Sequence, residues 1–186
     1  IRFRDDMPLP LARKLAAAGL AFYVLRIGAT TLSLGLAADD QSAKLKALDH
    51  VPVGAALVTL TGEACQSMWA LPRNSHIGAM AIVRRHAFSN DQWAIEGANL
   101  LTLRYRQAGY FIADPSQMVR PKACSHDERW AVDDALRAIP RDAFDYVWAL
   151  DLPPHDPNSL RGLRAVWRGP GTVLYAVEKS GGQQHQ

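Results

Sequence analysis

The hydrophobic positions of the sequence fall into one long block near the N-terminus and several short blocks after residue 40. The long block covers residues 15–38 and contains Arg26 as its only charged residue. As an α-helix it would extend about 36 Å, which is enough to cross a hydrocarbon core of roughly 30 Å. An arginine at mid-membrane costs at least ~2.5 kcal/mol unless it faces a polar neighbour. We therefore predict a membrane helix that packs inside a bundle of other helices.

Charges flank this long block asymmetrically. Positive side chains precede it and negative ones follow it directly: Arg2, Arg4, Arg13 and Lys14 before, Asp39 and Asp40 after. The positive-inside rule then places the N-terminal end in the cytoplasm and everything after Asp40 outside the membrane. Two alternatives stay open. One is a signal peptide, for which the block is long, and the other is a core helix of a soluble protein.

The short blocks predict strands that alternate with helices. Apolar runs bounded by turn residues indicate three strands, at 55–60, 100–105 and 144–150. Charge and helical spacing predict helices at 41–49 and 76–86. Ser125 and Glu128 form a capping box that would open a further helix, which Pro140 ends. The segments 164–168 and 172–177 flank a Gly-Pro-Gly turn and predict a hairpin.

Together these elements predict an α/β fold with a mostly parallel sheet, flanking helices and a C-terminal β-hairpin. A membrane helix or another long N-terminal helix precedes this fold. We expect two parts: residues 1–40, a juxtamembrane segment with the last membrane helix, and residues 41–186, a soluble extracytoplasmic domain. Because the chain begins at Ile1 rather than Met, we expect it to be a piece of a longer protein.

Composition and motifs exclude several functions. The 186 residues carry a formal net charge of +3 and no basic run longer than Arg84-Arg85-His86, so we expect no nucleic-acid partner. The glycine-rich nucleotide-binding patterns are absent, so we expect no cofactor. The six histidines form no H-E-x-x-H motif and no short-spaced pair, so no metal site is expected. No G-x-S-x-G motif is present, which disfavours an α/β-hydrolase.

The chain has two cysteines, Cys65 and Cys124. In the cytosol they would be buried or idle thiols, because disulfides are rare there. Outside the cytosol a disulfide between them would close a loop of about 60 residues and stabilise the fold by ~4 kcal/mol. We predict this disulfide on condition that the domain is extracytoplasmic.

Two polar loops are candidates for a binding groove. One contains Asn90, Asp91, Gln92 and Trp93, and the other contains Asp114 and Gln117. Stacking on Trp93 and hydrogen bonds from the polar side chains would suit a sugar. Turn formation is the alternative role of these residues. Among the histidines, His76 and His155 are the candidates for such a site, because both lie in loops or at the ends of elements.

Segments spread over nearly the whole chain carry a resemblance to a known family. They are residues 48–54, 76–85, 88–93, 114–117, 144–148, 153–154, 166–168 and 173–175. They resemble the C-terminal domain of polytopic bacterial inner-membrane proteins that are similar to GT-C glycosyltransferases, the dolichyl-phosphate-mannose mannosyltransferase-like enzymes. The resemblance implies that residues 15–38 are the last membrane helix and that the rest is a periplasmic cap. It also implies a polyprenyl-phosphate sugar donor, with the catalytic carboxylate in an early loop outside this sequence.

We therefore expect a non-catalytic periplasmic domain of an inner-membrane, glycosyltransferase-like protein. It would recognise a glycan or polyprenyl-linked sugar, or act as a structural lid, with the remaining membrane helices of the parent protein as partners. We expect no activity from this chain alone. One alternative is a soluble α/β enzyme that acts on a small polar substrate. Another is an interaction module that uses exposed tryptophans among Trp69, Trp93 and Trp130.

Overall fold

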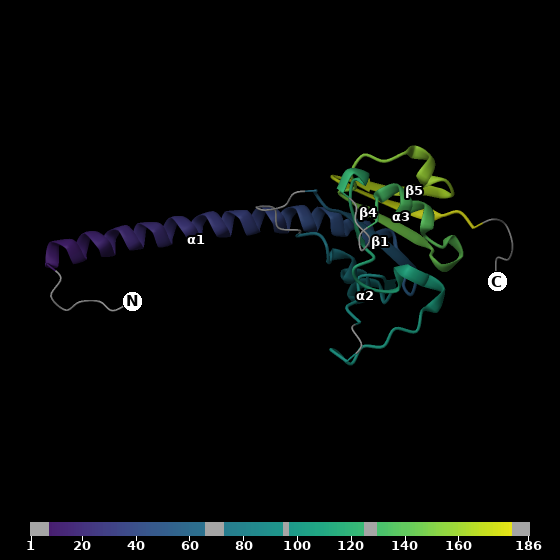
Figure 1. Cartoon of the computed structure of the whole chain (residues 1–186), viewed down its shortest axis with the longest axis horizontal. Coiled ribbons are helices and arrows are strands. Elements are labelled where there is room, and N and C mark those ends of the chain that lie inside the picture. The colour runs from purple at the N-terminus through teal and green to yellow at the C-terminus, as the bar shows by residue number, and fades with distance from the viewer. Residues whose placement is uncertain (1–7, 66–72, 95–96, 125–129, 180–186) are drawn as a thin grey trace. The chain divides into compact units, whose positions relative to one another are not determined.

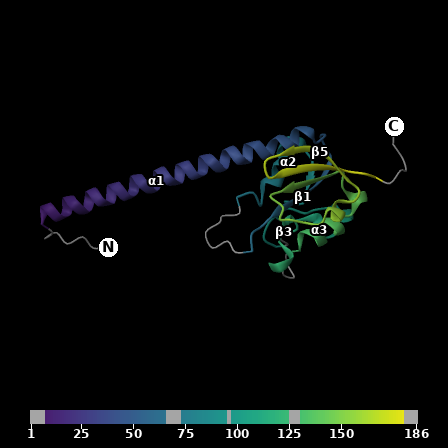
Figure 2. The ribbon, with the colours of Figure 1, turned by 90° about the horizontal axis from the view of Figure 1, so that it is seen from above.

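The computed structural model describes residues 8–65, 73–94, 97–124 and 130–179. It divides into two compact units, Ile1–Asp40 and Gln41–Gln186. Helix α1 (Leu9–Leu45) runs without a break, as both ribbon views show (Figures 1 and 2). The last turn of α1 therefore belongs to the second unit.

Helix α1 is long and apolar enough to cross a membrane, by length and composition. No part of its most apolar 18-residue window is buried, and large side chains such as Phe22 and Leu25 are exposed. The helix predicted for residues 15–38 is confirmed as a helix. An unburied apolar surface of this length is not typical of a core helix, because a core helix buries its apolar face. The helix and the disulfide described below are compatible with a membrane protein.

The second unit is built on one mixed sheet with the strand order β2-β1-β4-β6-β5, and β3 also pairs with β1. The strands are β1 (Ala56–Gly62), β2 (Phe88–Ser89), β3 (Met118–Val119), β4 (Tyr146–Leu150), β5 (Leu163–Gly169) and β6 (Thr172–Val177). Strand β1 pairs in parallel with β2, β3 and β4, whereas β4–β6 and β5–β6 are antiparallel. The predicted α/β fold, with a mostly parallel sheet and a C-terminal hairpin, is confirmed.

Short helices connect the strands. They are η1 (Lys46–His50), η2 (Ile77–Ala79), α2 (Met80–Arg85), η3 (Arg106–Ile112), η4 (Lys122–Cys124), α3 (Val132–Ala138), η5 (Arg141–Ala143) and η6 (Pro157–Leu160). Helices α2 and α3 pack into different core clusters, one on each face of the sheet (Figure 2). The predicted helix at 76–86 is thus confirmed as η2 followed by α2.

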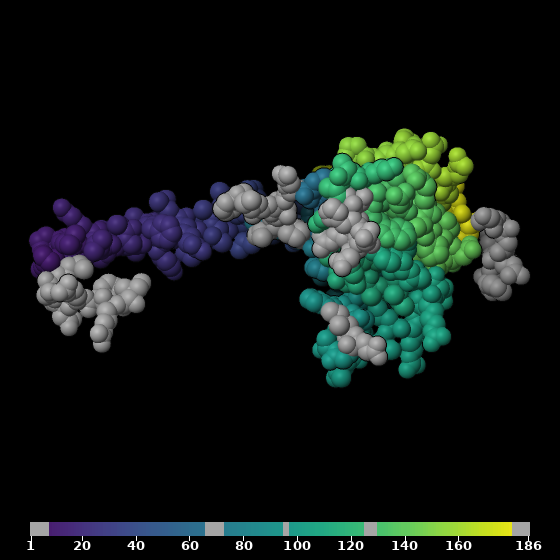
Figure 3. Space-filling view, in the orientation of Figure 1, coloured from purple at the N-terminus to yellow at the C-terminus, as the bar shows by residue number. Residues whose placement is uncertain are grey.

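The core explains why β1 is mostly apolar and buried along its length. Val58 and Leu60 point into the cluster that contains Leu136 of α3, whereas Leu57 points into the opposite cluster with Trp148. A central parallel strand is covered on both faces, so both sets of alternating side chains are buried, and most of those in β1 are apolar, with Thr59 and Thr61 as buried polar exceptions. On the face shown in Figure 3, the teal atoms of 97–124 lie directly against the green atoms of 130–150.

Two local predictions need correction. The strand predicted at 100–105 is wrong: this segment has no strand, and the side chain of Leu100 is fully exposed. An apolar run becomes a strand only where a neighbouring strand can pair with it, and here none does. The capping box of Ser125 and Glu128 lies outside the described residues, and the helix expected there is α3, which begins at Val132.

The predicted disulfide is confirmed. Cys65 and Cys124 are bonded, with their Cα atoms 5.5 Å apart. The bond ties the segment after β1 to η4, which follows β3 along the chain. The bond therefore closes a covalent loop between residues 65 and 124, and this loop contains the residues of the site described next.

Candidate functional site

The candidate site lies beside a gap between β2 and β3 at one edge of β1. Strands β2 and β3 pair with the same edge of β1, β2 opposite Ala56 and Leu57 and β3 opposite Thr61 and Gly62. Within the described part of the chain, no strand pairs with Thr59 on this edge. Instead, the Thr59 N–H donates to Asn90 Oδ1 (2.7 Å), and Asn90 Nδ2 donates to the Thr59 carbonyl (3.1 Å). The amide of Asn90 thus takes the place of a strand backbone.

The gap brings two distant loops together. The chain leaves the sheet after Ser89 and returns at Ser116 and Gln117 to begin β3. Asn90 Nδ2 also donates to Ser116 Oγ (3.0 Å), and the Thr61 N–H donates to the Gln117 carbonyl (2.6 Å). The returning loop is therefore held against the end of β2 by the same asparagine that fills the gap.

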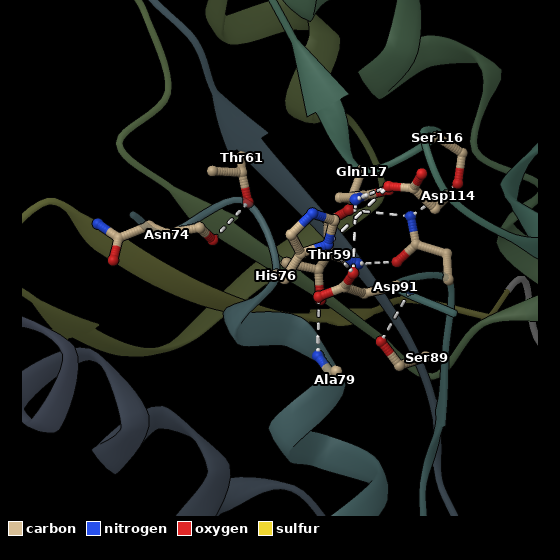
Figure 4. Close-up of polar contacts among 11 residues, drawn as sticks. Thr59, Thr61, Asn74, His76, Ala79, Ser89, Asp91, Asp114, Ser116 and Gln117 are labelled. Atoms are coloured by element: carbon tan, nitrogen blue, oxygen red, sulfur yellow. Dashed lines mark hydrogen bonds and ion pairs between the residues drawn. The ribbon is translucent and has the colours of Figure 1, made fainter. Parts of the chain in front are cut away.

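Four side chains converge beside this gap: His76, Asp91, Asp114 and Gln117, hereafter the edge cluster (Figure 4). His76 Nδ1 lies 2.8 Å from Asp91 Oδ1 and 3.9 Å from Asp114 Oδ1. Gln117 Nε2 donates to Asp114 Oδ1 (2.5 Å) and to Asp91 Oδ1 (3.4 Å). The second oxygen of Asp91 accepts from the Ala79 N–H at 2.9 Å. The cluster thus combines an imidazole, two carboxylates and a primary amide.

Gly78 allows the segment that carries His76 to approach the sheet. A Cβ atom at this position would lie 2.6 Å from the Thr59 Oγ1 atom of β1, too close for any other residue without a shift. Because residue 78 has no side chain, the backbone of η2 packs directly against β1. That close approach puts the Ala79 N–H within reach of Asp91.

Burial makes Asp91 electrostatically unusual. Its side chain is almost completely buried, whereas the side chain of His76 is 56% exposed. Burial raises the pKa of Asp91 above its ordinary value, and hydrogen bonds from His76 and the Ala79 N–H offset only part of this effect. Asp114 raises the pKa of Asp91 further through like-charge repulsion. Carboxylates whose pKa is perturbed by burial and by a neighbouring charge are typical of functional sites.

The structure brings together only some of the residues selected from the sequence. Asn90 fills the gap, and four of the others form the edge cluster. Gln92 points back to the sheet edge, where its Nε2 donates to the Ser89 carbonyl (2.9 Å). The side chain of Trp93 is exposed. That these residues bind a sugar stays a prediction.

His155 lies apart from the edge cluster. Its Nδ1 donates to the Pro153 carbonyl (2.8 Å), and it lines a cavity of about 350 Å³ with Arg168 and Tyr175. For the interaction-module alternative, Trp69 lies outside the described residues. Trp130 stacks on Tyr110 with ring centroids 4.7 Å apart.

Sequence reasoning missed the parts of the site that depend on tertiary contacts. The backbone N–H of Ala79, the missing side chain of Gly78 and the hydroxyl of Ser116 carry no sequence signal of their own. The sequence also gave no sign that His76, Asp91 and Asp114 place possible ligand atoms within 4.8 Å of one another, because these residues are far apart in sequence. A short-spaced metal motif could not have revealed them.

Comparisons of the chain with protein-family models, curated proteins and solved structures gave no match. The resemblance to GT-C glycosyltransferases therefore stays a prediction. The features that bear on function are the geometry of the edge cluster, the apolar helix α1 and the disulfide.

The raised pKa of Asp91 predicts a pH-dependent effect of the Asp91→Asn substitution. Below the ordinary pKa of 3.8 the carboxyl is protonated in the folded and the unfolded chain alike. As the pH rises, the unfolded carboxyl ionises first, so the unsubstituted chain loses stability until the folded carboxyl ionises too. Asparagine does not titrate and keeps an oxygen that can accept from the Ala79 N–H. The free energy of unfolding of Asp91→Asn relative to the unsubstituted chain should therefore rise with pH above 3.8 and then level off.

Urea unfolding of both chains in detergent micelles, over a series of pH values, measures this difference. Asp133→Asn is the matched control, because Asp133 lies on α3 and not in the edge cluster. A difference that falls as the pH rises would mean that the folded chain favours the ionised form of Asp91, contrary to our account.

Proposed function

We propose that the chain is a membrane-tethered extracytoplasmic domain of a glycosyltransferase-like protein and that its edge cluster recognises a glycan. In this proposal α1 is the last membrane helix of the parent protein. The domain binds the acceptor glycan or the polyprenyl-linked sugar and is not itself catalytic. The remaining membrane helices of the parent protein are its partners.

The observation that carries the location is the disulfide in a domain that follows an apolar, unburied helix. Structural disulfides persist in oxidising compartments and are rare in the cytosol. Basic residues precede the apolar part of α1, and Asp39 and Asp40 follow it, which favours a cytoplasmic N-terminal end. Both observations support a domain on the outer side of a bacterial inner membrane.

The chemistry of the edge cluster supports a hydroxyl-rich ligand. Carboxylates accept hydrogen bonds, while the amide of Gln117 and the ring of His76 can donate or accept them. A sugar presents neighbouring hydroxyls that need both kinds of partner. His76 is more than half exposed, so a ligand can reach the cluster from solvent. Trp93, two residues after Asp91, is exposed as well and offers an aromatic face.

One observation favours a second candidate function, an acid–base enzyme that acts on a small polar substrate. The nearly buried Asp91 holds Nδ1 of the exposed His76, which leaves Nε2 of the ring for a substrate proton. A buried carboxylate that orients an imidazole in this way is the arrangement found in Asp–His pairs of hydrolytic enzymes. The described residues include no serine or cysteine bonded to His76, so water would be the nucleophile.

The location is tested by fractionating bacterial membranes that contain the full chain. We expect the chain to stay in the membrane pellet after a carbonate wash. We also expect Cys65 and Cys124 to react with a maleimide only after reduction, because they are bonded to each other. Cys65→Ser is the matched control, since its Cys124 should react without a reductant. Release by carbonate, or free thiols in the unreduced chain, would contradict the proposed location.

Glycan recognition is tested with the full chain in detergent micelles on an oligosaccharide array. Asp114→Ala should weaken binding of any retained glycan by about tenfold or more, because it removes an acceptor and the shorter of the two hydrogen bonds that hold Gln117. His155→Ala is the control, since His155 lies outside the edge cluster. Equal binding by both variants, or no glycan retained by the unsubstituted chain, would overturn glycan recognition at this site.

A further inference from the structure

The edge cluster has the geometry of a metal site. Its ligand atoms lie within 4.8 Å of one another, and His76 Nδ1 is 2.8 Å and 3.9 Å from the two carboxylates. Around a tetrahedral ion with bonds of about 2.0–2.1 Å, neighbouring donors lie about 3.3 Å apart. The observed separations bracket this value. An ion could therefore replace the hydrogen bond between His76 and Asp91 with only small side-chain movements.

Gln117 supplies a second and independent indication of a ligand. Its side chain is completely buried and directs its amide into the cluster. Nε2 donates to both carboxylates, but Oε1 has no hydrogen-bond partner among the described residues. A buried acceptor without a partner costs about 1–3 kcal/mol. Rotating the amide by half a turn would direct Oε1 at the two carboxylates, which is unfavourable while both are ionised and becomes favourable when a cation lies between them.

The local charge balance also favours a cation. Within the described part of the chain, the imidazole of His76 is the only ion-pair partner of Asp91 and Asp114. The carboxylates of Asp91 and Asp114 have oxygens within 4.8 Å of each other, so they repel each other when both are ionised. The carboxylate of Asp91 is also nearly buried and therefore poorly solvated. A divalent ion would neutralise both charges at once.

We propose that the edge cluster binds a divalent transition-metal ion through His76 Nδ1, one oxygen each of Asp91 and Asp114, and Gln117 Oε1. One nitrogen and three oxygen donors suit Zn²⁺ or Mn²⁺, and Zn²⁺ should bind more tightly in the usual order of affinities. Mg²⁺ and Ca²⁺ prefer all-oxygen sites with more ligands and should bind least. The proposal concerns the same cluster as the proposed function but does not depend on glycan recognition.

The proposal is tested by calorimetric titration of the full chain in detergent micelles, stripped of metal with a chelator. We expect one equivalent of Zn²⁺ to bind, more tightly than Mn²⁺, and Ca²⁺ to bind weakest. His76→Gln should weaken Zn²⁺ binding by about tenfold or more. Because the side chain of His76 is more than half exposed, we expect this variant to fold, which its unfolding temperature checks. His155→Gln, which removes a histidine outside the cluster, should bind like the unsubstituted chain.

Two variants of Gln117 test its role as a ligand. Gln117→Leu should weaken Zn²⁺ binding, because it removes the oxygen. Gln117→Glu always directs an oxygen at Asp91 and Asp114, which repel it in the metal-free chain. This variant should therefore have a lower unfolding temperature without metal, and added Zn²⁺ should restore that temperature. A Gln117→Glu chain that gains no stability from Zn²⁺ would exclude this residue as a ligand.

The proposal is overturned if Zn²⁺ does not bind with a stoichiometry of one, or if His76→Gln and His155→Gln bind it equally. It is also overturned if Ca²⁺ binds as tightly as Zn²⁺. These outcomes are separate from those of the glycan array. If the unsubstituted chain binds a glycan but no Zn²⁺, only the metal site is refuted. If it binds Zn²⁺ but no glycan, only glycan recognition is refuted.

Discussion

The pair of hydrogen bonds between the Asn90 side chain and the backbone of Thr59 is the interaction on which the candidate site depends. Without it, the middle of β1 would leave a buried N–H and a buried carbonyl unpaired, at about 1–3 kcal/mol each. With it, the edge of β1 can be shared by two very short strands. The chain can then leave the sheet between them and return with a second set of polar residues.

The site follows from this gap in the sheet. Asp91 is the next residue after Asn90, so filling the gap places its carboxylate just beyond the end of β2. Ser116 bonds to the same asparagine and fixes the returning loop, which carries Asp114 and Gln117. The disulfide links Cys65 to Cys124, so it closes a covalent loop that contains all four residues of the edge cluster. Connections from β1 to β2 and from β3 to β4 pass over opposite faces, an arrangement in which α/β sheets commonly bind ligands near strand ends.

The sequence predicted the parts of the fold whose signal is local. Strands β1 and β4 are buried on both faces and give mostly apolar runs. The hairpin of β5 and β6 is marked by its glycine–proline turn. Strands β2 and β3 have two residues each, which is too short for any periodic pattern. The run at 100–105 looked like a strand because sequence cannot show whether a pairing partner exists. Asp91, Asp114, Gln117 and His76 were selected as polar loop residues, but their convergence depends on the gap and on Gly78. His155 shows that the same local criterion also selects a residue that lies elsewhere.

The account is tested most directly by the hydrogen exchange of the Thr59 amide, followed by NMR on the full chain in detergent micelles. Thr59 lies opposite the gap between β2 and β3, where no strand among the described residues covers this edge of β1. If Asn90 takes the place of a strand, the Thr59 amide exchanges as slowly as the other amides in the middle of β1. Exchange at the rate of an open loop would show that the gap is not filled, and the origin that we assign to the edge cluster would be wrong.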